Sequence, residues 1–196
     1  MAAEPESAQG LPLAIGVALA QVVENAVGAD VSLKWPNDVL VGARKLAGIL
    51  VELVVTGRST HALVGIGLNV RVPDYVARTI DQPWVDLAAL GGELPSRNVL
   101  AARLVDEVHG TLARFREVGF DAVERARWHR LDAFHDAPVE VRRGDDVFTG
   151  VERGVDASGR LRIETAGEIV LLDSGETSIR RLASDATAGD RSGAGS

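Results

Sequence analysis

The chain has no cysteine, few aromatic residues and no excess of positive charge. Without cysteine, disulfides, zinc–thiolate sites and cysteine nucleophiles are excluded, and the absence is consistent with a reducing compartment. Aromatic residues make up only 4% of the 196 residues, so the core must be built from Ala, Val, Leu and Ile. These absences indicate a globular protein whose chemistry does not depend on thiols.

The charge balance and the lack of long apolar runs exclude further classes of protein. A formal net charge of −7 argues against nucleic-acid binding and against an anionic membrane surface, because both need clustered Lys and Arg. No apolar run approaches the roughly 20 residues needed to span a bilayer. Residues 1–10 lack the basic and apolar regions of a signal peptide. We therefore expect a cytoplasmic protein with no membrane partner.

Apolar spacing in the first part of the chain predicts one helix and then a set of strands. Three- and four-residue spacings predict a helix over residues 11–28, with Gly28 as its carboxyl-terminal stop. Alternating apolar residues and short connections then indicate strands over residues 31–35, 38–41, 45–55 and 62–70. Consecutive strands with such short connections favour an antiparallel meander.

The second part of the chain divides into helices followed by short strands. A long helix capped by Ser96 and ended by Gly119 precedes a second helical segment over residues 121–131. After Pro138, closely spaced turns separate short strands, which is the pattern of a small barrel. We place a domain boundary near Asp136. The expected organisation is a disordered segment 1–10, a domain 11–135, a barrel 136–183 and a disordered tail 184–196.

The most informative stretch is Lys-Trp-Pro-Asn-Asp at residues 34–38, followed by Lys-Leu-Ala-Gly-Ile-Leu at 45–50. Lys45 heads a strand with apolar residues at both alternating positions, so we expect that strand to be buried on both faces. An ammonium at the mouth of such a strand suits a carboxylate or a phosphate. A solvated outer face explains an isolated strand lysine equally well, and Asn-Asp after proline is also typical of a turn.

The stretch Gly-Ile-Gly-Leu-Asn-Val at residues 65–70 is not a dinucleotide-binding fingerprint. The third glycine is missing, and Pro73 stands where a helix would have to open. The glycines instead allow a planar ligand to lie against the strand, or they mark a bulged or tightly packed strand.

The four histidines are scattered along the chain and are interpreted as structural or exposed residues. They are His61, His109, His129 and His135. We find no pair among them at the spacing of metal ligands and no nucleophile constellation.

Three motifs taken together resemble biotin protein ligases in order, spacing and residue type. They are the stretches at residues 34–38, 44–52 and 65–70, and the resemblance extends over residues 11–182. It implies an α+β fold in which a mixed sheet with helices is related to class II aminoacyl-tRNA synthetases and lipoyl ligases. A small SH3-like barrel is expected at the carboxyl terminus, in agreement with the boundary near Asp136.

The resemblance also implies a reaction in two steps. The biotin carboxylate attacks the α-phosphate of ATP, with Mg²⁺, to give biotinyl-5′-adenylate and pyrophosphate. A lysine of a biotin carboxyl carrier domain then attacks this mixed anhydride. The implied partners are ATP, biotin and the carrier domain of a biotin-dependent carboxylase, and a homodimer is expected.

By this resemblance, the catalytic residues are Lys45, which contacts the biotin carboxylate and the α-phosphate, and Asp38, which orients Lys45 or the acceptor lysine. Asn37 is also expected to meet the metal through the ATP phosphates. The implied biotin-binding residues are Lys45, Gly48, Ile49, Leu50, Gly65 and Gly67. The implied ATP-binding residues are Lys34, Asn37, Asn69 and Arg180.

One motif of the family is absent from this sequence. Biotin protein ligases carry an upstream loop of the type Gly-Arg-Gly-Arg-x-Gly-Arg, which closes over biotin and the adenylate. We therefore expect a chain equivalent to the last two-thirds of a ligase, with little or no activity alone. Two alternatives stay open: a non-catalytic fragment that binds the carrier or dimerises, and lipoate or octanoate transfer on the related fold.

Overall fold

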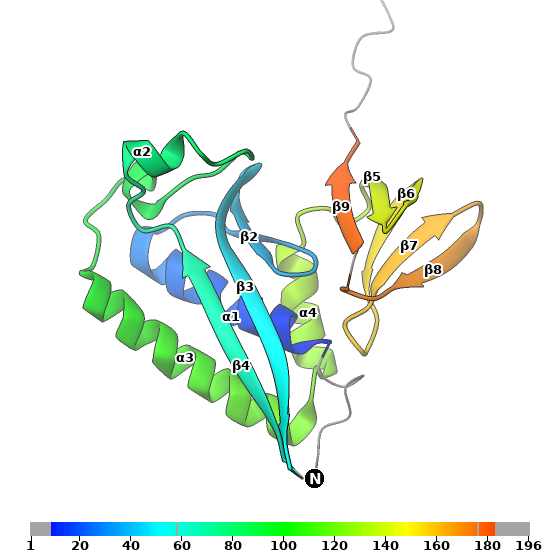
Figure 1. Ribbon diagram of the computed structural model, residues 1–196, viewed down its shortest axis with the longest axis horizontal. Coiled ribbons are helices and arrows are strands. Elements are labelled where there is room, and N and C mark those ends of the chain that lie inside the picture. Colours follow the sequence, from blue (N-terminus) through cyan, green and yellow to red (C-terminus); the bar gives the residue numbers. More distant parts are fainter. Residues whose placement is uncertain (1–8, 58, 176, 183–196) are drawn as a thin grey trace, which may run out of the picture.

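The computed structural model describes residues 9–57, 59–175 and 177–182 (Figure 1). Residues 1–8 and 184–196, which we predicted to be disordered, lie outside these ranges, whereas Gln9 and Gly10 form a turn that leads into the first helix. None of the helices in the described ranges is long and apolar enough to cross a membrane.

Helix α1, Leu11–Val27, is the central element of the core. Its apolar residues are buried, and Pro12 stands in the first turn, where a missing N–H costs nothing. Gly28 adopts a left-handed conformation, and its N–H donates to the carbonyl of Glu24. The predicted helix and its glycine stop are therefore confirmed.

Four strands follow in an antiparallel sheet of order β1-β2-β3-β4. They are β1 (Ser32–Lys34), β2 (Asp38–Val41), β3 (Arg44–Thr56) and β4 (Ser59–Leu68). The predicted meander is confirmed, and within the described residues all strand pairs of this sheet are antiparallel rather than mixed.

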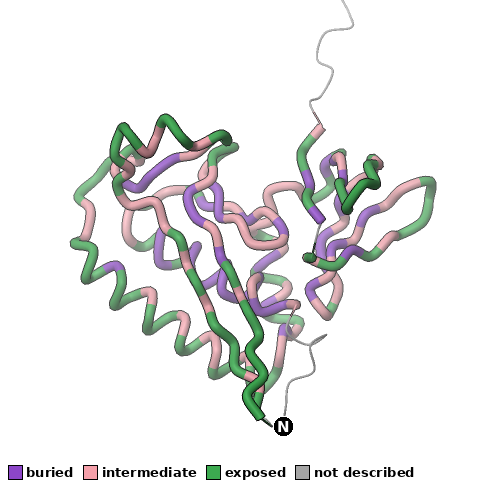
Figure 2. Tube along the Cα trace, viewed as in Figure 1, coloured by how far each residue is buried: buried purple, intermediate pink, exposed green. Residues whose placement is uncertain are grey.

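The expectation that β3 is buried on both faces is wrong for the part of the strand that follows Ile49. Leu46 and Ala47 are buried, but Leu50 is 59% exposed and Val55 is 72% exposed. Helix α1 contacts the sheet near the beginning of β3, while β3 and β4 continue outward as an exposed hairpin (Figure 2). Where α1 does not cover this sheet, apolar side chains of β3 stay exposed to solvent, even though their spacing in the sequence predicts burial.

Three further helical elements follow this sheet, and the last of them is the long helix. They are α2 (Asp74–Ala77), the 3₁₀ helix η2 (Leu87–Leu90) and α3 (Arg97–Val118). The Ser96 side chain accepts a hydrogen bond from the N–H of Val99, and Gly119 ends α3, as predicted. Apolar residues recur at three- and four-residue spacing along α3, but only Leu100 among them is buried. The remaining residues of this series line a cavity of about 890 Å³ between α3 and β4: Leu104, Val108, Leu112 and Phe115.

Helix α4, Ala122–Leu131, leads into a second antiparallel sheet of order β8-β7-β6-β5-β9. Its strands are β5 (Pro138–Arg143), β6 (Asp146–Val155), β7 (Leu161–Thr165), β8 (Glu168–Leu172) and β9 (Thr177–Arg181). The prediction of short strands after Pro138 is confirmed. Apolar side chains from β5, β7 and β9 form the core of this part: Val139, Val141, Leu161, Ile163 and Ile179.

Hydrogen bonds join the first sheet to the loop between β6 and β7 and to the segment that follows α4. The indole Nε1 of buried Trp35 donates to the carbonyl of Gly159 over 3.1 Å. The N–H of Ala133 donates to the carbonyl of Leu33 over 2.8 Å. These contacts fix the two parts against each other and leave a cleft on one side of the joint.

Candidate functional site

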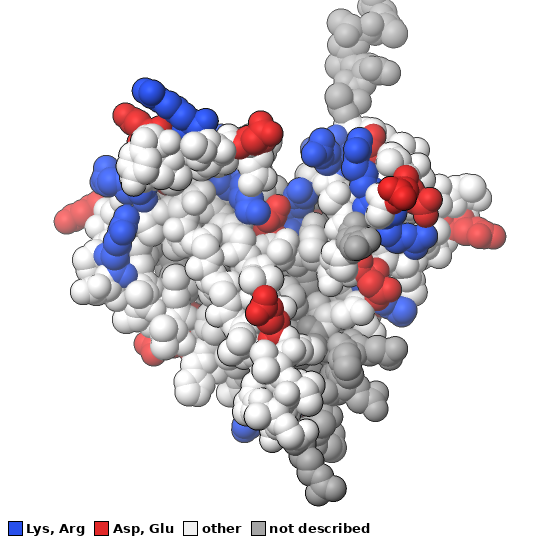
Figure 3. Space-filling model, viewed as in Figure 1, with Lys and Arg blue, Asp and Glu red and all other residues white. Residues whose placement is uncertain are grey.

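The candidate site is a cavity of about 810 Å³ between the first sheet and the carboxyl-terminal strands. Its walls come from β1, β2 and β3 on one side, and from β9 and the segment after α4 on the other. Figure 3 shows a notch between the two lobes, with basic and acidic side chains gathered in it. Four of the residues predicted from the sequence line this cavity together: Lys34, Asp38, Lys45 and Arg180.

Asp38 lies between the two motif lysines. Its Oδ1 is 2.5 Å from Nζ of Lys45, and its Oδ2 is 3.6 Å from Nζ of Lys34. All three side chains are partly buried, with exposed fractions of 15% for Asp38, 25% for Lys34 and 29% for Lys45. One carboxylate therefore holds two ammonium groups at the mouth of the sheet, where both can still reach a ligand.

A β-bulge directs Lys45 toward this carboxylate. Ala47 pairs with Val39 and Lys45 pairs with Leu40, so Leu46 is an extra residue in β3. In a regular strand the side chains of residues 45 and 48 would point to opposite faces. The bulge removes this alternation, and a Cβ placed on Gly48 would lie 3.3 Å from Nζ of Lys45. Gly48 thus leaves the space that the lysine occupies.

The backbone of Lys45 is held from both sides. Its N–H donates to the carbonyl of Pro83, and its carbonyl accepts from the N–H of Val85. The side-chain amide of Asn69 also donates to the carbonyl of Lys45, over 3.4 Å, and to that of Val85, over 3.1 Å. This network fixes the position of Lys45 before any ligand arrives.

The lining of the cavity is basic, although the chain as a whole is acidic. Lys34, Lys45, Arg180 and Arg181 outnumber the acidic lining residues Asp38 and Asp81, while the chain carries a net charge of −7. Such a local excess of positive charge attracts an anion and offsets the charge of a phosphate or carboxylate.

Glycines form an open strip on the face of the sheet that carries the Lys45 ammonium. Gly48 pairs with Gly67, and Leu50 pairs with Gly65, so all four residues share one face. That face offers bare backbone beside the exposed side chain of Leu50. Ile49 points the other way and is 2% exposed, packed against α1.

The amide of Asn37 is used within the protein. Its Nδ2 donates to the carbonyl of Ile49 over 2.8 Å and ties the turn after β1 to β3. Asn37 and Asn69 thus have a visible role in positioning the strands around Lys45, and their contacts with ATP stay predictions.

The interpretation of the histidines as separate residues is wrong for His129 and His135. Their ring centroids are 5.7 Å apart, and with Asp132 they bring ligand atoms within 4.8 Å of one another. The three residues follow one another at intervals of three, a signal that the sequence contained. We missed it because Asp132 and His135 lie beyond the last turn of α4, where helical spacing no longer predicts which side chains meet.

Comparisons with known proteins identify related families in both parts of the chain. Residues 4–69 match the biotin/lipoate A/B protein ligase family, and residues 134–180 match the biotin protein ligase C-terminal domain. The bifunctional ligase/repressor BirA of Salmonella typhimurium is 40% identical over 178 residues, which are 90% of this chain and 55% of that protein. The biotin--[acetyl-CoA-carboxylase] ligase of Mycobacterium tuberculosis is 34% identical over 85% of this chain and 60% of its own length. The chain thus spans little more than half the length of these relatives.

Solved structures show the same fold. A biotin protein ligase from Aquifex aeolicus matches with a TM-score of 0.76 and 26% identity, over 91% of this chain and 77% of the other. The same enzyme in complex with biotin and ATP matches with a TM-score of 0.74 and 26% identity, over 89% of this chain and 72% of the other. The predicted fold class is confirmed.

Proposed function

This chain belongs to the biotin protein ligase family, and from that premise we propose that it takes part in ATP-dependent attachment of biotin to a carrier protein. The observation that most strongly supports this proposal is the contact of Lys34 and Lys45 with Asp38. These side chains line a basic cavity between the first sheet and the carboxyl-terminal strands. We propose that this cavity receives the triphosphate of ATP and the carboxylate of biotin.

In the first step a carboxylate oxygen of biotin attacks the α-phosphorus of ATP. The bond to the bridging oxygen breaks, and pyrophosphate leaves with its electron pair. Two anions must approach each other, so cations have to offset their repulsion and the charge that develops on the phosphoryl oxygens. Lys45 is the proposed cation for this role because the bulge and Gly48 direct its ammonium to the open face. Lys34 and Arg180 are proposed to bind the remaining phosphates.

In the second step the amine of an acceptor lysine attacks the carbonyl carbon of the mixed anhydride, and AMP leaves. Asp38 is proposed to hold Lys45 in place during the first step and to orient the incoming amine in the second. Its carboxylate contacts both motif lysines and is 15% exposed, so it is within reach of a group that enters the cavity.

The strip of glycines is the proposed binding face for the biotin rings. Gly48, Gly65 and Gly67 let a planar ligand lie against the backbone, and Leu50 supplies an apolar contact beside them. Ile49 contributes only through its backbone, because its side chain is packed in the core.

Mg²⁺ is proposed to arrive with the phosphates of ATP rather than in a cage of protein ligands. Asp38 faces two ammonium groups, which makes its carboxylate a poor metal ligand. Asn37 donates through Nδ2 and keeps its Oδ1 as an acceptor, so it is the proposed contact to a phosphate-bound Mg²⁺. Such binding, with few protein ligands, is common for Mg²⁺ in nucleotide sites.

The proposed partner is the biotin carboxyl carrier domain of a biotin-dependent carboxylase, and the proposed location is the cytoplasm. We propose residues 11–135 as the partial catalytic unit and residues 136–183 as the barrel. A role as a carrier-binding or dimerising module is a second candidate. It is favoured by β4, which lies at an edge of the sheet beside exposed Leu53 and Leu63.

A single-turnover assay tests the proposal. The chain, in excess over ATP labelled at the α-phosphate, is incubated with biotin and Mg²⁺, and biotinyl-5′-adenylate is separated by chromatography. We expect slow, biotin-dependent formation of the adenylate, reduced at least about 100-fold in Lys45→Ala. Arg44→Ala is the matched control, since the exposed Arg44 precedes Lys45 on the same strand and should leave the rate unchanged.

The same assay separates the alternatives. Lipoate that forms an adenylate while biotin does not would assign the site to lipoyl transfer. A chain that forms no adenylate but captures a carrier domain without biotin or ATP would be the binding module.

A further inference from the structure

A second group of polar side chains lies at the joint between α4 and the carboxyl-terminal strands. His129 stands in the last turn of α4, Asp132 follows the helix end, and His135 lies three residues further along. One possible ligand atom from each residue lies within 4.8 Å of those of the other two. Because α4 ends before Asp132, the chain turns there and brings the two imidazoles together.

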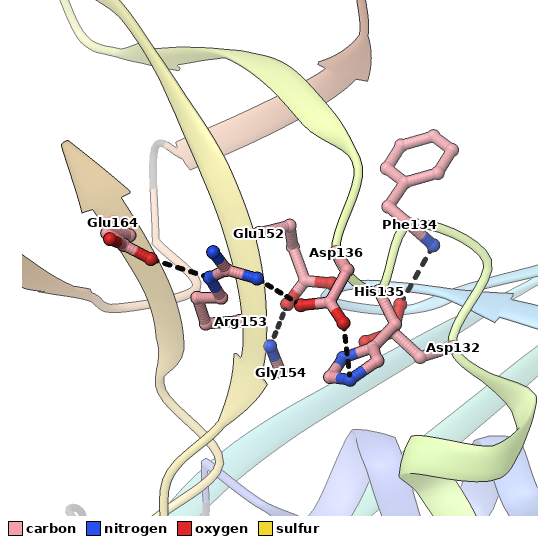
Figure 4. Close-up of polar contacts among 8 residues, drawn as sticks. All are labelled: Asp132, Phe134, His135, Asp136, Glu152, Arg153, Gly154 and Glu164. Carbon is pink, nitrogen blue, oxygen red and sulfur yellow. Dashed lines mark hydrogen bonds and ion pairs between the residues drawn. The ribbon is translucent and has the colours of Figure 1, made fainter.

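Glu152, which lies on β6, extends toward this group of side chains. It is fully buried, and its Oε1 accepts a hydrogen bond from the N–H of Gly154. Its Oε2 and the Oδ2 of Asp132 are buried without a hydrogen-bond partner in the described part of the chain. Figure 4 shows Asp132, His135 and Glu152 between β6 and the segment after α4.

These carboxyls are poorly compensated by the basic groups around them. Arg153 is the residue next to Glu152, but its Nε donates to Glu164 over 2.7 Å and its Nη1 binds Asp136. A buried oxygen without a partner is costly, so a bound cation would relieve this cost.

The surroundings fit a metal site. A Cβ on Gly154 would lie 1.9 Å from Cε1 of His129, so only glycine leaves room for that imidazole. Oδ2 of Asp136 is 3.6 Å from Nε2 of His135, where it can orient a ring bound through its other nitrogen. The His135 side chain is 46% exposed and therefore free to adjust.

We propose that His129, Asp132 and His135 bind a divalent transition-metal ion of the zinc class. Two imidazole nitrogens and one carboxylate oxygen form the mixed nitrogen and oxygen set of three-ligand zinc sites, in which a solvent molecule takes the fourth tetrahedral position. Ligands at about 2.0–2.1 Å from the ion lie roughly 3.4 Å apart, so the residues must close in slightly from their present spacing. The ion would connect the last turn of α4 to the segment that leads from it into β5, and Glu152 of β6 would lie beside it.

The test is a titration of the untagged, chelator-treated chain with Zn²⁺ by calorimetry and with Co²⁺ by visible absorption, both without nucleotide. We expect one ion per chain and a tetrahedral Co²⁺ spectrum. Zn²⁺ should also raise the midpoint of thermal unfolding. His135→Ala should weaken binding on the order of 10–100-fold or more.

His109→Ala is the matched control, because His109 lies on α3 and lines the other cavity. It should bind Zn²⁺ as the parent chain does. Circular dichroism of each variant establishes that it is folded, and the exposed position of His135 makes its variant the safest one. Unchanged affinity in His135→Ala, the absence of a one-to-one site, or a preference for Mg²⁺ over Zn²⁺ would each overturn the proposal.

Discussion

At the scale of single residues, the site depends on how one carboxylate is placed. Asp38 contacts both motif lysines, so it fixes their ammonium groups without removing them from the cavity. Neither lysine would be held at a defined point without this carboxylate, because four-carbon side chains are flexible. The sequence indicated the residue types and their proximity, but the contact itself depends on the pairing of Asp38 with Gly48 across two strands.

A buried carboxylate elsewhere gives a pH-dependent prediction. Burial raises the pKa of Glu124, and Arg127 and Arg114 offset this only in part. An acid with a raised pKa in the folded state binds its proton more tightly there than in the unfolded chain. Its contribution to stability therefore falls as the pH rises above the ordinary value of 4.5.

We expect Glu124→Gln to raise the thermal midpoint by up to a few degrees at pH 7 and to change it little at pH 4. Thermal denaturation followed by circular dichroism at both pH values measures the effect. Glu117→Gln, at an exposed position on α3, serves as the control and should change neither midpoint. An equal gain at both pH values would show that burial of the charge is not the cause.

At the scale of elements, the ends of helices were predictable and the bulge was not. Gly28, Ser96 and Gly119 mark helix boundaries because their conformations or side chains satisfy backbone groups locally. The bulge at Leu46 arises from the register between β2 and β3, which depends on two segments at once. The sequence therefore indicated Lys45 as a candidate site residue, but the direction of its side chain toward Gly48 became visible only in the structure.

Burial of elements was harder to predict than their type. Apolar residues at both alternating positions of β3 predicted a strand covered on both faces, but its outer half forms a hairpin with β4 in solvent. The apolar face of α3 likewise meets a cavity over most of its length. A single sequence shows which residues are apolar, and the number of layers around a sheet decides which of them are covered.

At the scale of the whole molecule, the cavity exists because two parts are fixed against each other. The motif lysines lie on the first sheet and Arg180 lies on β9, so their approach depends on the joint. The change in strand and turn spacing predicts a boundary between these parts near Asp136, and that boundary stays a prediction. The contacts across the joint were not foreseen, since they connect distant residues: Trp35 and Gly159 are 124 positions apart in the chain.

The hydrogen bond from Trp35 to Gly159 is the most buried of these contacts, and it gives a prediction for stability. Trp35→Phe leaves the Gly159 carbonyl without its donor, which should cost about 1–3 kcal/mol. Urea denaturation followed by circular dichroism measures the free energy of unfolding. Trp84→Phe, at a partly exposed position, is the control and should cost clearly less. Equal losses in the two variants would mean that this bond does not hold the joint.

The central claim is that Lys45, held by Asp38 and the bulge, is the cation that receives the phosphates of ATP. Calorimetric titration of the chain with ATP and Mg²⁺ tests it most directly, because binding is measured without any need for turnover. We expect Lys45→Ala to weaken binding of ATP at least about tenfold, because the variant loses one charge-assisted contact. Arg44→Ala should bind ATP with the affinity of the parent chain. Equal affinities for ATP in the parent chain and in Lys45→Ala would contradict the claim.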